Sequence, residues 1–290
     1  MQCSWRSLRD RHTNVIKLIR VMIKLFILTN MDICISDPKK IAQFANIFRH
    51  CKHITEVVNL NFDSDGLYMQ GMDASHACLF ELKISGEWFD EFKVKTDCIV
   101  GVYCEILFRI ISCLSDGQCI TLSMGDSKDQ LCIDFTGKGT IEKSFEIPLV
   151  DVISDILTAP EIEYTADIGF ESAEFAALIR QLSIFSDTLR FNLSDRGIDL
   201  IASGDHGKMT ADIKEELVNE YAVEEGADLS VSFGMTYMEK ICSFSKLSND
   251  MTVHCHLEFP MRVDYPLDGR SFSDSESYMR FFLAPKIDDE

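Results

Sequence analysis

An apolar stripe with helical spacing follows Pro38. Its members lie at positions i, i+3, i+4 and i+7, and they are Phe44, Ile47, Phe48 and Cys51. This spacing predicts a helix that buries one face. The same pattern returns 131 residues later, with the members Phe175, Leu178, Ile179 and Leu182, so that Cys51 corresponds to Leu182. Two helices of one kind are therefore expected, one in each half of the chain.

Three further elements keep this offset. An alternating strand pattern from Gly66 through Met72 returns from Gly197 through Ser203, and both glycines are predicted at hairpin turns that need a positive φ. A second helical stripe occurs twice, as Ile106, Leu107, Ile110 and Ile111 and as Tyr237, Met238, Ile241 and Cys242. The strand at 120–122 returns at 251–253. One offset across four elements predicts an internal duplication.

The repeated unit is predicted to be an α+β domain. Alternating apolar and polar residues at 78–83 and 131–135 indicate antiparallel strands with one buried face. Two helices on one face of a mainly antiparallel sheet make a two-layer unit, present twice. We expect domains at 31–147 and 164–290, joined by a proline-flanked, acidic connector at 148–163.

The formal net charge of −19 argues at first against a nucleic-acid binder. The repeat shows, however, that cations are segregated. Arg49 maps onto Arg180 and Arg109 onto Lys240, each on the predicted exposed side of a helix, and Lys52 adds one more. Such a stripe could follow the phosphates of duplex DNA without reading bases. For any one of these residues, ordinary solvated helix surface is the alternative. Aromatics interleaved with Arg or Lys, which single-strand binding uses, are not expected on these faces.

Catalytic and metal chemistry find little support in the sequence. The eleven cysteines contain no CxxC pair, so reduced and buried thiols are expected rather than zinc or disulfides. In a strand, His254 and His256 would point away from Cys255. Asp63, Asp65 and Asp73 flank a hairpin turn, where aspartate is common. No phosphate-binding or hydrolase motif occurs. We therefore predict no enzyme activity, no cofactor and no metal.

Residues 1–30 differ from the rest in carrying six basic residues against one acidic residue, a charge of +5. Their apolar run at 15–28 is interrupted by three cations, so a bilayer-spanning helix is not expected. Two interpretations stay open. The segment is a targeting or surface-binding leader, or it is a partly disordered extension with Met31 starting the functional domain.

Four stretches of the sequence carry a resemblance to a known family. They are Gly71–His76, Ser172–Ala176, Ser203–Asp205 and Phe282–Glu290. Over Met31–Glu290 the sequence resembles the proliferating cell nuclear antigen family, the eukaryotic DNA sliding clamps. The resemblance implies a nuclear homotrimer whose helices line a channel around duplex DNA, and which tethers DNA polymerase, clamp loader and other replication and repair proteins. A ring held by topology needs little affinity for DNA, which fits the acidic composition.

The resemblance also assigns residues. Lys52, Arg109 and Arg180 match channel cations, whereas the family commonly has Lys or Arg at Ala45, Asn46, Ser112, Ala177 and Ser243, so a weakly basic bore is expected. The positions that match the partner-peptide pocket are Met72, His76, Leu79, Leu157, Ala159, Pro160, Tyr164, Pro260, Phe282, Leu283, Ala284 and Pro285. Subunits would pair Glu142–Leu149 of one chain with Lys208–Lys214 of the next. Asp195-Arg196 replaces a lysine that the family modifies.

One rival stays open at this point. The chain could be a subunit of a heteromeric, checkpoint-type ring that has specialised away from replication.

Overall fold

The computed structural model describes residues 30–124, 129–152, 156–158, 162–194, 196–269 and 275–286. The first half contains β1 (Met31–Ile35), α2 (Pro38–Cys51), β2 (Val57–Phe62), β3 (Gly66–Met72), β4 (Cys78–Ser85), β5 (Glu91–Val94), β6 (Cys98–Tyr103), α3 (Cys104–Ile111), β7 (Cys119–Met124), β8 (Gln130–Thr136) and β9 (Lys143–Pro148). The second half contains β10 (Ala166–Glu171), α4 (Ser172–Leu182), β11 (Thr188–Ser194), β12 (Gly197–Gly204), β13 (Gly207–Ile213), β14 (Glu220–Val223), β15 (Asp228–Gly234), α5 (Met235–Cys242), β16 (Asp250–Cys255), β17 (Met261–Pro266) and β18 (Tyr278–Leu283). This α+β duplication is the predicted fold class.

The helices follow the predicted stripes. Asp37 caps α2 by accepting hydrogen bonds from the backbone N–H groups of Lys39 and Lys40 at 2.7 and 3.1 Å, and Pro38 occupies the first turn, where its missing N–H costs nothing. The predicted stripe of α2 is fully buried. The helices α2 and α4 end at the same offset of 131, but α2 has 14 residues and α4 has 11, so α2 begins about one turn earlier.

One predicted core position is wrong. Ile106 is 42% exposed, because α3 has only eight residues and buries the side that carries Leu107, Ile110 and Ile111. Its repeat partner Tyr237 is only half-buried as well.

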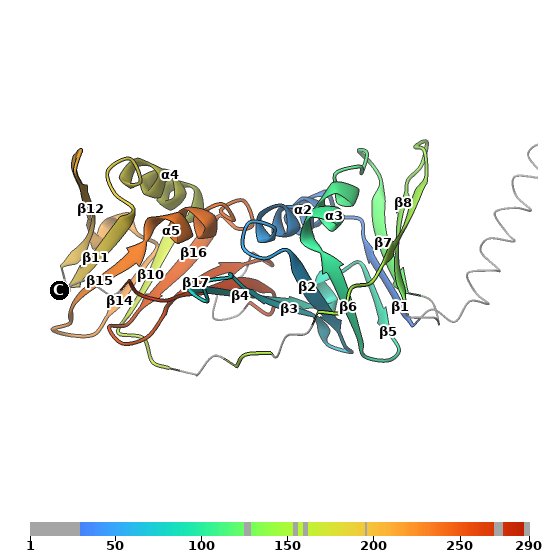
Figure 1. Ribbon diagram of the computed structural model, residues 1–290, viewed down its shortest axis with the longest axis horizontal. Coiled ribbons are helices and arrows are strands. Elements are labelled where there is room, and N and C mark those ends of the chain that lie inside the picture. The colour runs from blue at the N-terminus through green and yellow to red at the C-terminus, as the bar shows by residue number, and fades with distance from the viewer. Residues whose placement is uncertain are drawn as a thin grey trace, which may run out of the picture.

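The four helices of the described residues lie along one long side of the molecule, and the connector runs along the opposite side (Figure 1). Each half contributes a five-stranded and a four-stranded antiparallel set. In the middle of the molecule, β18 of the second half pairs with β4 of the first, with Phe281 opposite Phe80, so that two sets merge into one nine-stranded sheet. The sequence pattern did not predict this continuity.

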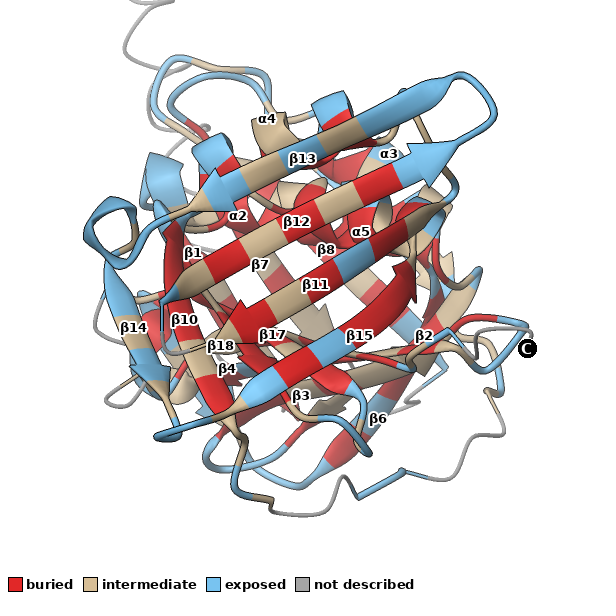
Figure 2. Cartoon of the chain, turned by 90° about the vertical axis from the view of Figure 1, so that its left-hand side faces the viewer, coloured by how far each residue is buried: buried red, intermediate tan, exposed pale blue. Residues whose placement is uncertain are grey.

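The two remaining sets are separate sheets, in the orders β5-β1-β7-β8-β9 and β13-β12-β11-β15. In these sheets β9 is an outer strand of the first half, and β13 is an outer strand of the second half. Figure 2 shows β13 at the margin of its sheet, with mostly exposed and half-exposed residues along it.

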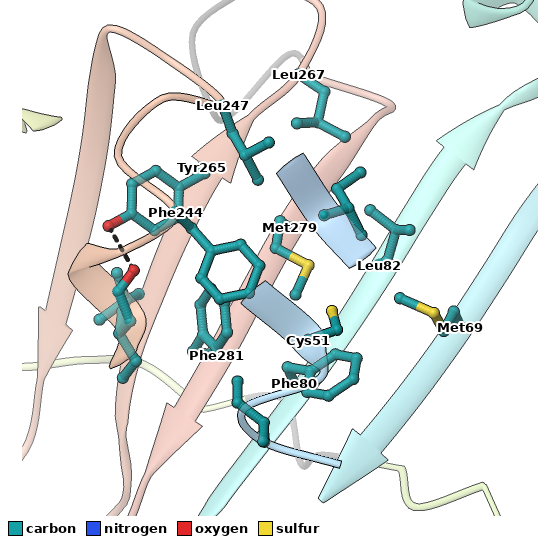
Figure 3. Packing of buried hydrophobic residues seen from close by; sticks show 14 of the residues in the cluster. Cys51, Met69, Phe80, Leu82, Phe244, Leu247, Tyr265, Leu267, Met279 and Phe281 are labelled. Atoms are coloured by element: carbon teal, nitrogen blue, oxygen red, sulfur yellow. Dashed lines mark hydrogen bonds between the residues drawn. The ribbon is translucent and has the colours of Figure 1, made fainter. Parts of the chain in front are cut away.

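An aromatic core crosses the junction of the halves (Figure 3). The Phe281 ring lies 4.9 Å from Phe244, 6.2 Å from Tyr265 and 6.4 Å from Phe80, measured between ring centroids. The buried hydroxyl of Tyr265 donates to the carbonyl of Ile241 at 3.2 Å, so this phenol is not left unsatisfied. The two repeats therefore share one continuous core.

The two hairpin glycines differ from each other. Gly197 has φ of 147°, in the region that favours glycine, as predicted. Gly66 does not have a positive φ, so that prediction is wrong. It is constrained by space instead, because a Cβ atom there would lie 2.1 Å from the carbonyl oxygen of Ile84.

All described cysteines are free thiols. The buried ones are Cys51, Cys78, Cys98, Cys104, Cys242 and Cys255, as expected. The expectation of burial is wrong for Cys34, Cys119 and Cys132, which are half-buried, and for Cys113, which is exposed. Burial raises the pKa of the Cys104 and Cys255 thiols to about 12, which makes these two unreactive at neutral pH.

Candidate functional site: a basic helix face and an apolar groove

The five predicted cations all lie at helix C-termini on the helix-bearing side (Figure 1). Arg49, Arg109, Arg180 and Lys240 occupy the last turns of α2, α3, α4 and α5, and Lys52 is the C-cap of α2. Cations there are favourable for the helix dipole, so each residue has a local structural role as well. The four helices lie on one side of the molecule (Figure 1), so the turns that carry these cations are on that side too.

In the first half, three of these cations gather around Phe108 and Glu105, both on α3. The Phe108 ring lies 5.4 Å from the Arg49 guanidinium and 4.8 Å from the Lys52 ammonium. Glu105 accepts from Lys52 Nζ and from Arg109 Nε, each at 2.7 Å. The expectation that no aromatic is interleaved with cations is therefore wrong, because Phe108 projects into the seam between α2 and α3.

The second half is arranged differently. Lys240 lies over the ring of Tyr237 at 5.4 Å, and the Tyr237 hydroxyl donates to Asp73 in the turn of the first half at 3.0 Å. Arg180 is exposed. Among the described residues, neither Arg180 nor Lys240 forms an ion pair, so these two cations are not neutralised by a carboxylate.

Sequence reasoning missed Lys246, an exposed residue after α5. Burial lowers the pKa of His50 on α2 to about 4, and the charges of Arg49, His53, Lys246 and Lys52 add to this shift. Lys246 therefore contributes to the positive potential at the end of α2. The repeat could not reveal it, because its counterpart at an offset of 131 is Ser115.

The opposite side of the molecule holds the described part of the connector against the outer face of the sheet. Gln70 donates to the carbonyl of Leu157 at 2.7 Å and accepts from its N–H at 2.8 Å. Asn59 donates to the carbonyl of Val152 at 2.9 Å. The side-chain amides of two strands thus fix the connector's backbone at two points.

Under this connector lies a cavity of about 150 Å³. Its lining consists of Asn59, Asn61, Gln70, Gly71, Met72, Leu79, Ile99, Ile156 and Leu157. It brings together three predicted pocket residues, Met72, Leu79 and Leu157. Ile99 and Ile156 were not predicted, and their side chains are 63% and 59% exposed. The available signal for Ile99 was an apolar residue at an outward-facing strand position.

The other predicted pocket residues are placed as follows. His76 is exposed with φ of 60°, and Phe282 is half-buried opposite Leu79. Ala284 is exposed and donates its N–H to the carbonyl of Ala77 at 2.9 Å, which ties the C-terminal segment to the turn. Pro260 is exposed and Pro285 half-exposed. Leu283 is fully buried in the core, so its side chain does not line the groove. Ala159 and Pro160 lie outside the described residues.

Tyr164 does not line this cavity and packs instead on an ionic network of the second half. Its hydroxyl lies 3.5 Å from the Pro260 carbonyl, and its ring contacts the Arg262 guanidinium at 5.0 Å and the His254 ring at 5.4 Å. At the centre, Asp264 is fully buried, 2.7 Å from Arg280 Nε and 3.0 Å from His254 Nε2.

This network also crosses the domain junction, because Arg280 pairs with Glu81 of β4 at 3.0 Å. Burial alone would lower the pKa of His254, but its hydrogen bonds to Asp167 and Asp264 outweigh that effect and raise the pKa.

Asp63 and Asp73 lie in two successive turns, and each carboxylate accepts hydrogen bonds from the backbone of its own turn. Asp63 accepts from the N–H groups of Asp65 and Gly66 at 2.8 and 3.0 Å. Asp73 accepts from those of Ala77 and Cys78 at 2.8 and 2.7 Å. Within the described ranges, no cluster of three or more His, Cys, Asp or Glu residues could hold a metal ion. In the same ranges no helix has the length and apolarity needed to cross a membrane.

Two family descriptions match the chain: "Proliferating cell nuclear antigen, N-terminal domain" over residues 39–156 and "Proliferating cell nuclear antigen, C-terminal domain" over residues 158–286. Proliferating cell nuclear antigen of Chaetomium thermophilum is 28% identical over 245 residues, which cover 82% of this chain and 92% of the relative. Proliferating cell nuclear antigen 2 of Drosophila melanogaster is 25% identical over 239 residues, covering 82% and 91%. The crystal structure of the corresponding antigen from Entamoeba histolytica matches with a TM-score of 0.79 at 20% identity, covering 90% of this chain and all of that chain.

Proposed function

Because the chain belongs to the proliferating cell nuclear antigen family of non-enzymatic DNA sliding clamps, we propose that it is a replicative clamp. As such it closes into a homotrimer around duplex DNA and tethers DNA polymerase, the clamp loader and other peptide-motif partners. The observation that carries the proposal is the nine-stranded sheet at the centre of the chain. In that sheet the β18 edge of the second half pairs with the β4 edge of the first. The equivalent outer strands, β9 and β13, each have one edge that pairs with no other strand of the described residues.

The repeat specifies how two chains would pair. Phe145 of β9 is equivalent to Phe281 of β18, since each lies opposite the matching residue of the preceding strand. In the same way Met209 of β13 is equivalent to Phe80 of β4. The internal pair Phe281–Phe80 therefore translates into Phe145 opposite Met209 between subunits. The next pair along is Glu146 opposite Lys208, which have opposite charges.

A cross-linking experiment tests this register. In a Cys113→Ser background, which removes the exposed native thiol, the variant with Phe145→Cys and Met209→Cys is oxidised and run without reductant. Directly opposed residues lie close enough to form a disulfide, so a covalent ring of three chains is expected. The control pairs Phe145→Cys with Ala211→Cys, two residues out of register, and should give little product. Equal yields from both pairs would overturn the proposed register.

The oligomeric state separates the replicative clamp from its rival. The chain has a mass of 33.0 kDa, so light scattering coupled to size exclusion should give three times that mass, 99 kDa. A chain that stays monomeric and joins a ring only with a different partner would refute the homotrimer and favour a heteromeric, specialised clamp. Family identities of 25–28% do not distinguish these two.

Encirclement has its own assay. A loaded ring should stay on circular DNA and run off the free ends of linear DNA, while ordinary binding treats both alike.

The groove of Met72, Leu79 and Leu157 supports the tethering role, because apolar walls beside fixed backbone suit a peptide with aliphatic and aromatic anchors. Affinity for such a peptide should fall when Leu79 is changed to Asp.

We also propose a nuclear location, in keeping with the family. The basic segment 1–30 lies almost entirely outside the described residues. A reporter fused to it that stays diffuse in cells would exclude a role as a targeting leader.

A further inference from the structure

On the helix-bearing side, which we call the DNA face in keeping with the proposed function, the two oxygens of the Glu105 carboxylate each contact a different cation. Glu105 Oε2 lies 2.7 Å from Lys52 Nζ and Glu105 Oε1 lies 2.7 Å from Arg109 Nε. Lys52 is the less accessible of the two, with 23% of its side chain exposed against 71% for Arg109. The hydrogen bonds from both cations hold the pKa of Glu105 below its usual range, so it stays charged near neutral pH.

We propose that Glu105 sets how strongly the ring holds DNA, by occupying Lys52 and Arg109 so that phosphate contacts fall mainly to Arg49, Arg180 and Lys240. This inference rests on the proposed function. A phosphate that approaches Lys52 has to displace a carboxylate that is already in contact, whereas one that approaches Arg49 or Arg180 does not. Among the described residues, these two arginines form no ion pair.

The repeat shows that the acidic residue is not needed by the fold. The position equivalent to Glu105 in the second half is Thr236, an exposed residue at the same place in α5. Lys240, the equivalent of Arg109, accordingly has no carboxylate partner within the described ranges. Glu105 is itself 40% exposed, and ion pairs at the protein surface contribute little to stability. The two halves therefore share a helix framework and differ in how far their cations are neutralised.

The inference predicts opposite effects for two substitutions. Glu105→Thr gives the first half the arrangement of the second and frees Lys52 and Arg109. Thr236→Glu gives the second half the arrangement of the first, because a Glu four residues before Lys240 on one helix can pair with it. DNA binding should therefore strengthen in the first variant and weaken in the second.

The measurement is the salt dependence of equilibrium binding by the full-length protein to a short linear duplex with free ends, which the ring can enter and leave so that topology does not hold it. Each phosphate contact adds about 0.9 to the slope of log K against log salt. Glu105→Thr and Glu105→Gln should steepen the slope, by about one to two units where one subunit faces the duplex. Each unit is a further loss of about 3- to 4-fold in affinity between 50 and 200 mM salt. Thr236→Glu should make the slope shallower by up to about one unit.

Two controls separate the possible failures. Glu174→Gln removes an exposed carboxylate from α4 that pairs with no cation among the described residues, so its slope should stay at the parent value. A steepening as large as that of Glu105→Gln would mean that overall charge alone is responsible, and would overturn the inference.

Arg49→Ala and Arg180→Ala should each reduce the slope. If they do so while Glu105→Gln changes nothing, Glu105 has no role and the DNA face stands. If neither arginine nor Glu105 affects binding, the helix side is not the DNA face, and the proposed function fails with it.

Discussion

Replacing Phe281 with alanine should remove the centre of the joint between the two halves. This ring is fully buried and packs against Phe80 from one half and Phe244 and Tyr265 from the other. Its strand β18 is held between β17 and β4, so the surrounding backbone cannot easily close around the space that the substitution leaves. We therefore expect a cost close to the upper part of the range for large-to-small core substitutions.

That range is about 3–5 kcal/mol for Phe→Ala. The loss is a large share of the roughly 5–15 kcal/mol that stabilises a typical native protein. For proteins of about this size each kcal/mol lowers the melting temperature by roughly 2–4 °C, so a cost of about 4–5 kcal/mol corresponds to a decrease of about 8–20 °C. Because the core is continuous across the joint, both repeats should unfold together in the parent protein.

The assay is thermal and urea unfolding followed by far-ultraviolet circular dichroism at two protein concentrations. Phe145→Ala is the matched comparison, because Phe145 holds the equivalent place on the outer strand β9 and is half-buried in the single chain. Its effect should depend on protein concentration if that strand pairs between subunits, whereas the effect of Phe281→Ala should be large at both concentrations. A cost of 1 kcal/mol or less for Phe281→Ala would refute the shared core.

Further expectations concern the ionic network, the inter-half contact and the thiols. The raised pKa of His254 contributes stability that is fully present below its unfolded value of 6.5 and is lost as pH rises through its folded pKa. His254→Gln should therefore reduce the fall in melting temperature as pH rises above 6.5. Parallel curves for the variant and the parent would contradict this. Tyr237→Phe removes the hydrogen bond to Asp73. It should lower the free energy of unfolding by about 1 kcal/mol and speed amide hydrogen exchange in the turn that contains Asp73. Unchanged exchange would show that this hydrogen bond does not stabilise the turn. Among the thiols that the structure describes, a reagent added to the native protein should label Cys113 first and Cys255 only after unfolding. Equal rates for these two would contradict the burial described above.

The order of the helices and many of the strands could be predicted because it depends on local periodicity. The stripes that end at Cys51 and Leu182 form by burying one face, and the repeat doubles the signal. The joint between β18 and β4 could not be predicted in this way. Its contacts link residues as far apart as Arg280 and Glu81, which are 199 positions apart, and no local pattern specifies such a pairing.

In the candidate site, too, contacts within one helix could be predicted from the sequence, whereas contacts between helices could not. Glu105 and Arg109 are four residues apart on one helix, so their ion pair was readable from spacing. The partnership of Glu105 with Lys52, and the position of Phe108 between two cations, depend on how α2 and α3 pack together. Ile106 was misplaced for a related reason, since its helix is too short to bury more than one narrow side.

The two kinds of seam in the proposed ring differ in strength. Inside a chain, the pairs Met279–Leu82 and Phe281–Phe80 meet across the seam, and the polypeptide itself prevents separation. Between chains, the equivalent pairs are Lys143–Ala211 and Phe145–Met209, with less apolar surface and nothing covalent to hold them. A ring that opens to admit DNA should therefore separate at one of the three β9–β13 contacts between subunits. Each subunit should then move as a rigid body, and the β18–β4 pairing inside every chain should stay intact.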